Sequence, residues 1–424
     1  MYFFTLLYLV AVLVRPQEYP QWADSGIPIL PILLLLAFLS WLASRGKDLS
    51  APQYALLFAF QVVLMLSQVF NGWTGGALQQ LSTFGPGIMA FLVLSHAAVE
   101  RKRVLSTMAV IVLSAALLSV HGIEQVTQGV GWTGVGLSQE TRIQYVGIFN
   151  DPNDLGLLFA MTVPMALLLG TRGGLLGLRR LFWWAGAGLI GYGIFLTSSR
   201  GALLAVIAIL GVWVWRRRGL VTAMLLGVGA LAAIMALPSR MGDIDAGEAS
   251  AAGRVDAWYS GFEMFFSNPL FGIGPGNFAD NNANLTAHNS FMLVLGETGF
   301  IGYTIWLAFV CYGFMMMLAI LRHQPELADA TRQADWKQEQ SIALTLLLCQ
   351  TGFFTAAFFL SRSYVILLYL LAALVLGFYS GARQRYPDLP RFELTHDLLR
   401  WPMRSLASIV GLYLLVKILL VTSS

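Results

Sequence analysis

Four charged or titratable side chains lie where apolar runs of the sequence begin or end. Arg200 follows a hydroxyl-rich triplet at 197–199 and opens an apolar run, and Arg362 lies between two serines. Arg254 lies in a long polar connection, and His288 closes that connection. Guanidinium groups can bind a phosphate or diphosphate with paired hydrogen bonds, and an imidazole titrates near neutral pH. These residues therefore predict a site that binds a diphosphate and activates an acceptor hydroxyl.

A second set of polar and aromatic residues lies next to this first group. Ser199 and Asn289 are immediate neighbours of the first arginine and of the histidine, and Trp258 comes four residues after Arg254. That spacing puts Arg254 and Trp258 on one face of a helix. We assign supporting roles to Ser199, Asn289, Trp258 and Arg362. A simpler interpretation stays open, because interfacial arginines also bind lipid headgroups and a histidine at a helix start can be an ordinary interface residue.

Two acidic pairs resemble the beginnings of a metal site. Asp243 and Asp245 form one pair, and Asp151 and Asp154 form the other. Hard cations such as Mg²⁺ need several oxygen ligands, so two carboxylates are a weak pattern. A solvated acidic loop fits the first pair better, and a helix cap followed by a first-turn acid fits the second. We expect neither a metal nor another cofactor.

The glycine-rich segment 272–278 invites comparison with a phosphate-binding loop. It lacks the Lys-Ser or Lys-Thr that ends such a loop, and no strand-like segment precedes it. Pro269 and Pro275 are typical of turns that end helices. The segment therefore predicts a turn.

The composition places these residues in a membrane protein. Of 424 residues, 57% are hydrophobic and 11% are charged, and the mean hydropathy is +0.70. Typical soluble domains have roughly 25% charged residues. In hydrocarbon each backbone polar group must be bonded within its own segment, which favours helices for long apolar runs. We expect an all-α, polytopic single transmembrane domain over 1–424, with about 12–13 membrane helices.

Apolar runs and basic clusters together predict the topology. The runs lie at about 2–14, 28–44, 54–70, 84–99, 104–121, 154–171, 181–197, 201–215, 220–237, 289–321, 340–360, 364–380 and 405–422. Basic residues gather in every second connection, at 45–47, 101–103, 172–180, 216–218, 322–337 and 383–404. Such clusters mark the cytoplasmic face. This orientation accounts for most of the formal charge of +4, and we expect no nucleic-acid partner.

Two connections on the opposite, external face are long. They cover 122–153 and 238–288, and the second carries several aromatic residues typical of helices at a membrane surface. Long ordered connections usually carry function. We therefore expect the second connection to carry active-site residues. Cys311 and Cys349 both lie inside apolar runs and predict no disulfide and no zinc site.

Five motifs in order resemble the O-antigen ligase and polymerase superfamily of bacterial envelope glycosyltransferases. They are Gly147-Ile-Phe-Asn-Asp-Pro-Asn-Asp-Leu-Gly156, Thr197-Ser-Ser-Arg-Gly-Ala-Leu-Leu204, Gly253-Arg-Val-Asp-Ala-Trp258, Asn268-Pro-Leu-Phe-Gly-Ile-Gly-Pro-Gly-Asn-Phe278 and His288-Asn-Ser-Phe-Met-Leu-Val-Leu-Gly-Glu-Thr-Gly-Phe-Ile-Gly302. The resemblance covers about 147–302.

The resemblance implies a metal-independent enzyme with a GT-C-like membrane fold. Such an enzyme moves a glycan from an undecaprenyl-diphosphate carrier to a sugar hydroxyl, at the periplasmic face of the bacterial inner membrane. By resemblance, Arg200 and Arg254 would bind the carrier diphosphate, and His288 would activate the acceptor.

Several functions remain open within that resemblance. The first is an O-antigen ligase that joins the carrier-linked glycan to lipid A–core, with membrane lipids around it. A polymerase of O-antigen or exopolysaccharide and a protein O-oligosaccharide ligase would use the same donor. A transporter is disfavoured, because ionisable residues are nearly absent from the middle of the apolar runs, with the exception of Lys417.

Overall fold

The computed structural model describes residues 1–23, 26–171, 177–236, 251–326 and 329–423. Within these ranges the chain is helical, with two isolated β-bridges and no strand. The expected all-α class is therefore confirmed. Asp243 and Asp245 lie outside the described residues, so their interpretation as a solvated pair stays a prediction.

The helices follow one another along the whole chain. They are α1 (Tyr2–Val14), η1 (Pro16–Glu18), α2 (Pro20–Ala23), α3 (Ile29–Leu42), α4 (Pro52–Phe70), α5 (Thr74–Ala97), α6 (Arg101–Gln128), η2 (Gly147–Phe149), α7 (Pro152–Leu169), α8 (Leu178–Thr197), α9 (Arg200–Arg218), α10 (Leu220–Ala236), α11 (Ala251–Ser267), α12 (Ser290–Arg322), α13 (Ala330–Ala357), α14 (Ile366–Arg385), α15 (Leu394–Asp397) and α16 (Arg400–Ser423).

The helices confirm a polytopic membrane protein. Each of the thirteen expected apolar runs overlaps a helix. Among the described residues, eight helices are long and apolar enough to cross a membrane: α4, α5, α6, α7, α12, α13, α14 and α16. The first run forms α1, which has 13 residues. It is shorter than the roughly 20 residues that a crossing needs.

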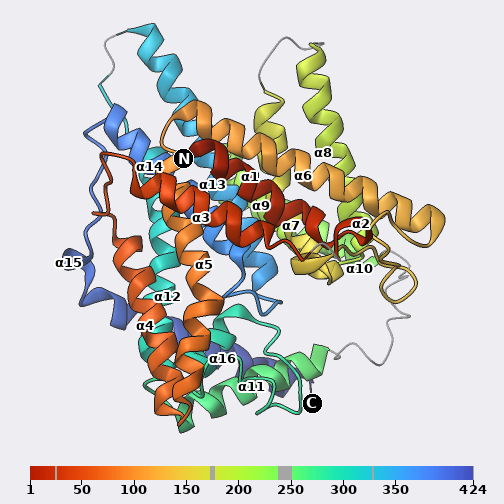
Figure 1. Cartoon of the computed structure of the whole chain (residues 1–424), viewed down its shortest axis with the longest axis vertical. Helices are drawn as coiled ribbons and strands as arrows, with labels where there is room; N and C mark the ends of the chain where they lie inside the picture. Colours follow the sequence, from red (N-terminus) through yellow and green to blue (C-terminus); the bar gives the residue numbers. More distant parts are fainter. Residues whose placement is uncertain (24–25, 172–176, 237–250, 327–328, 424) are drawn as a thin grey trace.

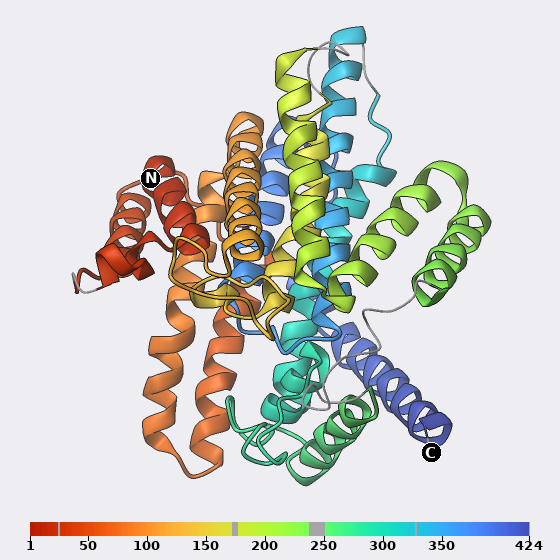
Figure 2. The ribbon, with the colours of Figure 1, turned by 90° about the vertical axis from the view of Figure 1, so that its right-hand side faces the viewer.

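The two ends of the molecule differ in which connections they carry. Figures 1 and 2 show the α4–α5 connection and α11 at one end of the long axis, and the first turns of α8 and α13 at the other. Helices α7 and α14 are central, because 83% and 78% of the residues in their most apolar stretches are buried. In α16, only 17% of the corresponding residues are buried. Small residues permit the central packing: a Cβ on Gly156 of α7 would lie 2.9 Å from the Cβ of Ala202 in α9.

Helix α12 bends near its start. Gly299 has φ +63°, and a Cβ there would lie 2.5 Å from the carbonyl carbon of Leu270. The bend frees two backbone N–H groups, and the preceding loop accepts both. Phe300 N donates to Pro269 O at 2.8 Å, and Ile301 N donates to Leu270 O at 3.3 Å. The glycine thus fastens segment 268–278 against the membrane helix.

Charged residues from three separate connections meet at one face. The Glu339 carboxylate of α13 accepts from Arg101 Nη2 of α6 at 2.9 Å and from Arg385 Nε of α14 at 2.8 Å. Arg101 and Arg385 belong to two of the basic clusters that the sequence assigns to one side, and Glu339 follows a third, at 322–337, by two residues. The structure therefore brings those clusters together. Which side of the membrane they face remains a prediction.

The two long connections are partly helical. Helix α6 continues to Gln128, beyond the apolar run, so irregular chain begins later than 122 in the first connection. In the second, Ala251–Ser267 forms α11, which packs against α12 and α16. Of the other described residues in this connection, 268–288 form loop and turn. This agrees with the helical content expected there.

Candidate functional site

A polar cavity of about 380 Å³ opens where five segments of the chain meet. We call it the arginine cavity, after Arg142, Arg254 and Arg362. Its lining residues come from the first long connection, the start of α7, α11, the end of the second connection and the α13–α14 connection. They are Ser138, Gln139, Arg142, Asn150, Asp151, Pro152, Asn153, Arg254, Leu285, Thr286, His288, Leu360, Ser361 and Arg362.

His288 projects from a firmly anchored backbone. Its φ of +46° is uncommon for a residue with a side chain. The next residue, Asn289, is buried and caps α12, with its side-chain oxygen accepting from Phe291 N at 2.8 Å and Met292 N at 3.1 Å. The Ser290 hydroxyl donates to Leu360 O at 2.7 Å. Asn289 therefore fixes the start of α12, and the preceding residue, His288, lines the cavity.

Arg254 reaches the cavity from α11, which the Trp258 ring anchors. Trp258 is buried and meets the ring of Phe358 edge-on, with centroids 5.4 Å apart. Arg254 lies one helical turn earlier, is half-buried and lines the cavity. The helix across both residues agrees with the expected shared face. Its packing against the end of α13 positions the arginine.

Arg200 is the first residue of α9. The preceding residue, Ser199, caps that helix by accepting from Ala202 N at 3.3 Å. Its hydroxyl also donates to Asn153 Oδ1 at 2.9 Å, which fixes the start of α9 against the start of α7. Arg200 itself is exposed, and it is absent from the described residues that line the cavity. The structure thus brings Arg254, His288 and Arg362 into one cavity, whose lining does not include Arg200.

Arg142 is a cavity residue that the sequence patterns did not single out. It is 8% exposed. Its Nε donates to Thr197 O at 3.0 Å, and its Nη2 donates to Asn153 Oδ1 at 3.0 Å. The guanidinium thereby ties the first long connection to two of the family-like motifs. A sequence signal did exist, because Arg142 is a basic residue in a connection assigned to the cation-poor face.

Arg362 pairs with two acidic residues at the start of α7, Asp154 in its first turn and the capping residue Asp151. Its Nε and Nη2 donate to the two carboxylate oxygens of Asp154, the latter at 2.6 Å, and Asp151 lies 3.6 Å from Nη2. Burial alone would lower the pKa of the Arg362 guanidinium, but hydrogen bonds and charge from Asp154, with further charge from Asp151, raise it. The carboxylates of Asp151 and Asp154 thus offset the positive charge of Arg362. Asp151 also caps α7 by accepting from Asn153 N at 2.7 Å, as expected.

Hydrogen bonds hold the glycine-rich segment against α12 and α4. The Glu297 carboxylate of α12 accepts from Gly276 N at 2.9 Å and Phe278 N at 3.3 Å. From α4, the Ser67 hydroxyl donates to Glu297 O at 2.9 Å. These hydrogen bonds within the protein explain the conformation of the segment, so no bound phosphate is needed to explain it. The predicted turn is confirmed. The loop that it anchors continues to His288.

The electrostatics of the cavity suit an anion. Three arginines line it against one lining carboxylate, Asp151, while Asp154 occupies Arg362. The cavity also lies where α7 and α12 begin, and the partial positive charge of a helix N-terminus favours an anion there. Among the described residues, no group of three His, Cys, Asp or Glu side chains could hold a metal ion.

Comparison with known proteins agrees with the motif analysis. The family model described as O-antigen ligase matches residues 185–307, from α8 into α12. That match contains Arg200, Arg254 and His288, and it confirms the resemblance to the O-antigen ligase superfamily over those residues. No curated protein matches the chain.

Proposed function

We propose that this chain, which carries an O-antigen ligase-type domain at 185–307, joins a glycan carried on undecaprenyl diphosphate to lipid A–core. The proposed reaction takes place at the periplasmic face of the bacterial inner membrane. The observation that carries the proposal is the arginine cavity, because it gathers Arg254 and His288 of the matched domain with Arg142 and Arg362.

In the proposed reaction the residues have separate tasks. His288 takes the proton from the acceptor hydroxyl as its oxygen bonds to the anomeric carbon of the donor glycan. The bond between that carbon and the carrier diphosphate breaks, and the diphosphate leaves with the electron pair. Arg254 and Arg200 bind the diphosphate and stabilise its growing charge. Asn289, Ser199 and Trp258 hold these side chains in place.

The location of the cavity favours a lipid-linked donor. It lies where the membrane helices α7 and α12 begin, between irregular connections and the apolar bundle. A carrier with an isoprenoid tail and a diphosphate head needs such a boundary, because the tail partitions into lipid and the head into a polar site. We propose that the reaction needs no metal, so purified enzyme should keep its activity in excess EDTA.

The decisive experiment is a null mutant examined by lipopolysaccharide gel. Loss of the whole long-chain ladder, with carrier-linked polymer accumulating, supports the ligase. A single-repeat band on lipid A–core would instead indicate the polymerase. The match to the ligase-type domain is equally compatible with that function. An unchanged ladder together with loss of glycan from a pilin-like protein would indicate the protein ligase.

A further inference from the structure

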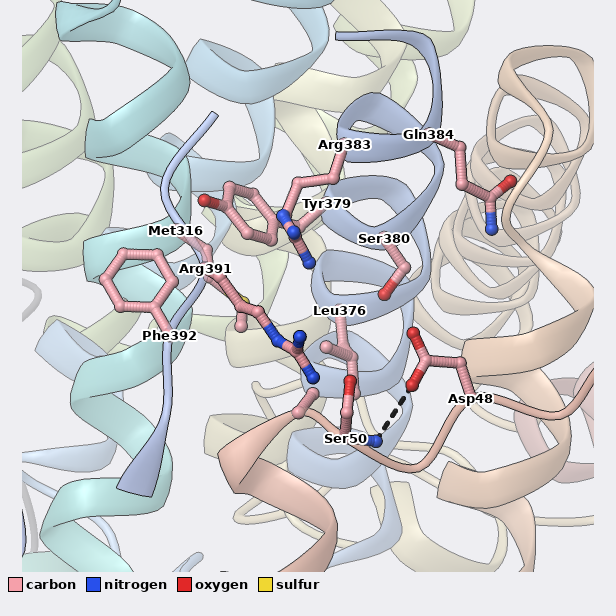
Figure 3. Close-up of a pocket in the computed structure, with 11 residues that line it drawn as sticks. Asp48, Ser50, Met316, Leu376, Tyr379, Ser380, Arg383, Gln384, Arg391 and Phe392 are labelled. Atoms are coloured by element: carbon pink, nitrogen blue, oxygen red, sulfur yellow. Dashed lines mark hydrogen bonds between the residues drawn. The ribbon is translucent and has the colours of Figure 1, made fainter. Parts of the chain in front are cut away.

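A second charged cavity lies between the α3–α4 connection, α14 and the coil after it. We call it the Asp48 cavity, and its volume is about 140 Å³. Its polar lining includes Asp48, Ser50, Arg383 and Arg391. Figure 3 shows the guanidinium groups of Arg383 and Arg391 turned toward one central space, with Asp48 and Ser50 beside it. None of these residues belongs to the arginine cavity.

The cavity is preorganised on the side that carries Arg391. The Tyr379 hydroxyl of α14 donates to Pro390 O at 2.6 Å, which holds the coil against the helix. The Phe392 ring lies 5.6 Å from the Tyr379 ring and 6.0 Å from the Tyr312 ring, measured between centroids. Arg391 stands between these two anchored residues, so its backbone is held beside the cavity. A held backbone reduces the entropy that the cation loses when it binds an anion.

Arg383 presents an unsatisfied donor. Its Nε is buried and has no hydrogen-bond partner in the described part of the chain. A buried N–H without an acceptor carries a free-energy cost that a ligand oxygen would remove. The guanidinium fork matches a phosphate group, which accepts two parallel hydrogen bonds.

The Asp48 carboxylate limits how much negative charge a ligand of the cavity can carry. Asp48 accepts from Ser50 N at 2.9 Å. Hydrogen bonds from Ser50 lower the pKa of Asp48, and the charges of Arg391 and Arg383 lower it further, so the group stays ionised. Arg391 also pairs with Glu393 at the rim, at 3.1 Å. A singly charged phosphodiester therefore suits the cavity better than a multiply charged ligand.

Size and surroundings indicate the same class of ligand. Pockets for whole small molecules measure about 300–1,000 Å³, so this cavity has room for a head group only. Its floor is apolar, with Met316, Leu376 and Phe392. It lies among the basic connections at 45–47 and 383–404, which the sequence assigns to the cytoplasmic side. Acidic lipids of that leaflet gather at basic pockets between membrane helices.

We propose that the Asp48 cavity binds the phosphate group of an anionic ligand, with Arg383 and Arg391 as its donors. A phospholipid headgroup or a free phosphate compound could supply that group. The cavity is independent of the proposed transferase site, and its test requires no transferase activity.

The test uses the purified full chain and two readouts. Thermal unfolding is measured with phosphatidylglycerol, with phosphatidylcholine and with inorganic phosphate, and bound lipid is counted by native mass spectrometry. Phosphatidylglycerol should raise the melting temperature by about 2 °C or more above phosphatidylcholine. Arg383→Gln and Arg391→Gln should each weaken that binding about tenfold or more. Arg218→Gln, a matched change in another basic connection, should have no effect.

Asp48→Asn separates binding from folding. The amide oxygen can still accept from Ser50 N, but the repulsion between carboxylate and phosphate disappears, so affinity for the probe should rise. If inorganic phosphate reproduces the stabilisation and both arginine variants abolish it, the phosphate chemistry is supported and the source is a soluble compound. The proposal is overturned if wild type and both arginine variants respond equally to every probe. It is also overturned if Asp48→Asn binds phosphatidylglycerol more weakly than wild type.

Discussion

The Arg362 guanidinium and the Asp154 carboxylate form a two-pronged ion pair although they lie 208 positions apart in the chain. The pair joins the α13–α14 connection to the first turn of α7. Asp154 is only 9% exposed. Because a buried carboxylate needs a partner, Arg362 has a structural task at this site before any ligand arrives.

Arg362→Ala should destabilise the protein by leaving Asp154 buried without its partner. We expect a loss of about 1–3 kcal/mol, measured by thermal unfolding in detergent. The double variant Arg362→Met with Asp154→Leu should recover part of that loss, because it removes both charges and keeps the volume. If the loss of stability in the double variant equals the sum of the losses in Arg362→Met and Asp154→Leu alone, the ion pair contributes no coupling free energy.

Arg142→Lys should reduce transferase activity by about tenfold or more. Arg142 donates from two different nitrogens to Thr197 O and Asn153 Oδ1, and a lysine ammonium cannot span both acceptors with the same geometry. The measurement is transfer of carrier-linked glycan by purified enzyme. Arg180→Lys on α8, outside the cavity, is the control. Equal activity of the two variants would remove Arg142 from the site.

Arg200→Lys and Arg254→Lys should both impair donor binding, although they keep the charge. The planar fork gives paired hydrogen bonds to a diphosphate, and lysine offers a single point charge. Binding of a carrier diphosphate is the measurement, with Trp258 left intact so that α11 keeps its anchor. Full binding in both Lys variants would leave only a general cationic role. Full activity in both Ala variants would exclude the two residues from the mechanism.

Local patterns predict the helices and the separate site residues, but not their pairing. The apolar runs mark where helices form, yet α6 continues to Gln128 because a polar last turn can still be helical outside lipid. Arg254 and Trp258 share a face because i,i+4 spacing is a local property. Arg362 and Asp154 meet only through the packing of α7 and α13, so nothing near either residue indicates the other.

The contacts of Arg142 also could not be predicted from local sequence patterns. Its neighbours in sequence are ordinary loop residues, and its partners Thr197 and Asn153 lie on two different helix ends. The positive-inside bias alone marks it as unusual. The Asp48 cavity was likewise hidden, because Arg383 and Arg391 look like ordinary members of a topogenic cluster.

The topology prediction can be tested with single cysteines. Cysteine at Asp280 should react with a membrane-impermeant thiol reagent in cells whose outer membrane is permeabilised, and cysteine at Lys102 should not. Both positions are exposed in the structure, so unequal labelling reports their side of the membrane. The background is a variant with Cys311 and Cys349 changed to Ala. Labelling of position 280 only after inner-membrane lysis would place the arginine cavity on the wrong side.

His288→Ala should lower the rate of glycan transfer by about 10²–10⁴-fold while donor binding persists. A base aligned with the acceptor hydroxyl typically contributes that much. His288 lines the cavity, and the capped start of α12 fixes its backbone. Because the neutral imidazole is the active form, activity should also fall at acid pH, where the imidazole becomes protonated.

His288→Asn distinguishes the base from a merely structural residue. Asparagine tolerates the positive φ of 46° found at this position and keeps a polar group there, so folding should be preserved. It cannot take up a proton at neutral pH, and its turnover should therefore match that of the Ala variant. Thermal unfolding checks that the variant remains intact. Near-normal turnover in His288→Asn, with no decline toward acid pH, would refute the base and leave the arginine assignments standing.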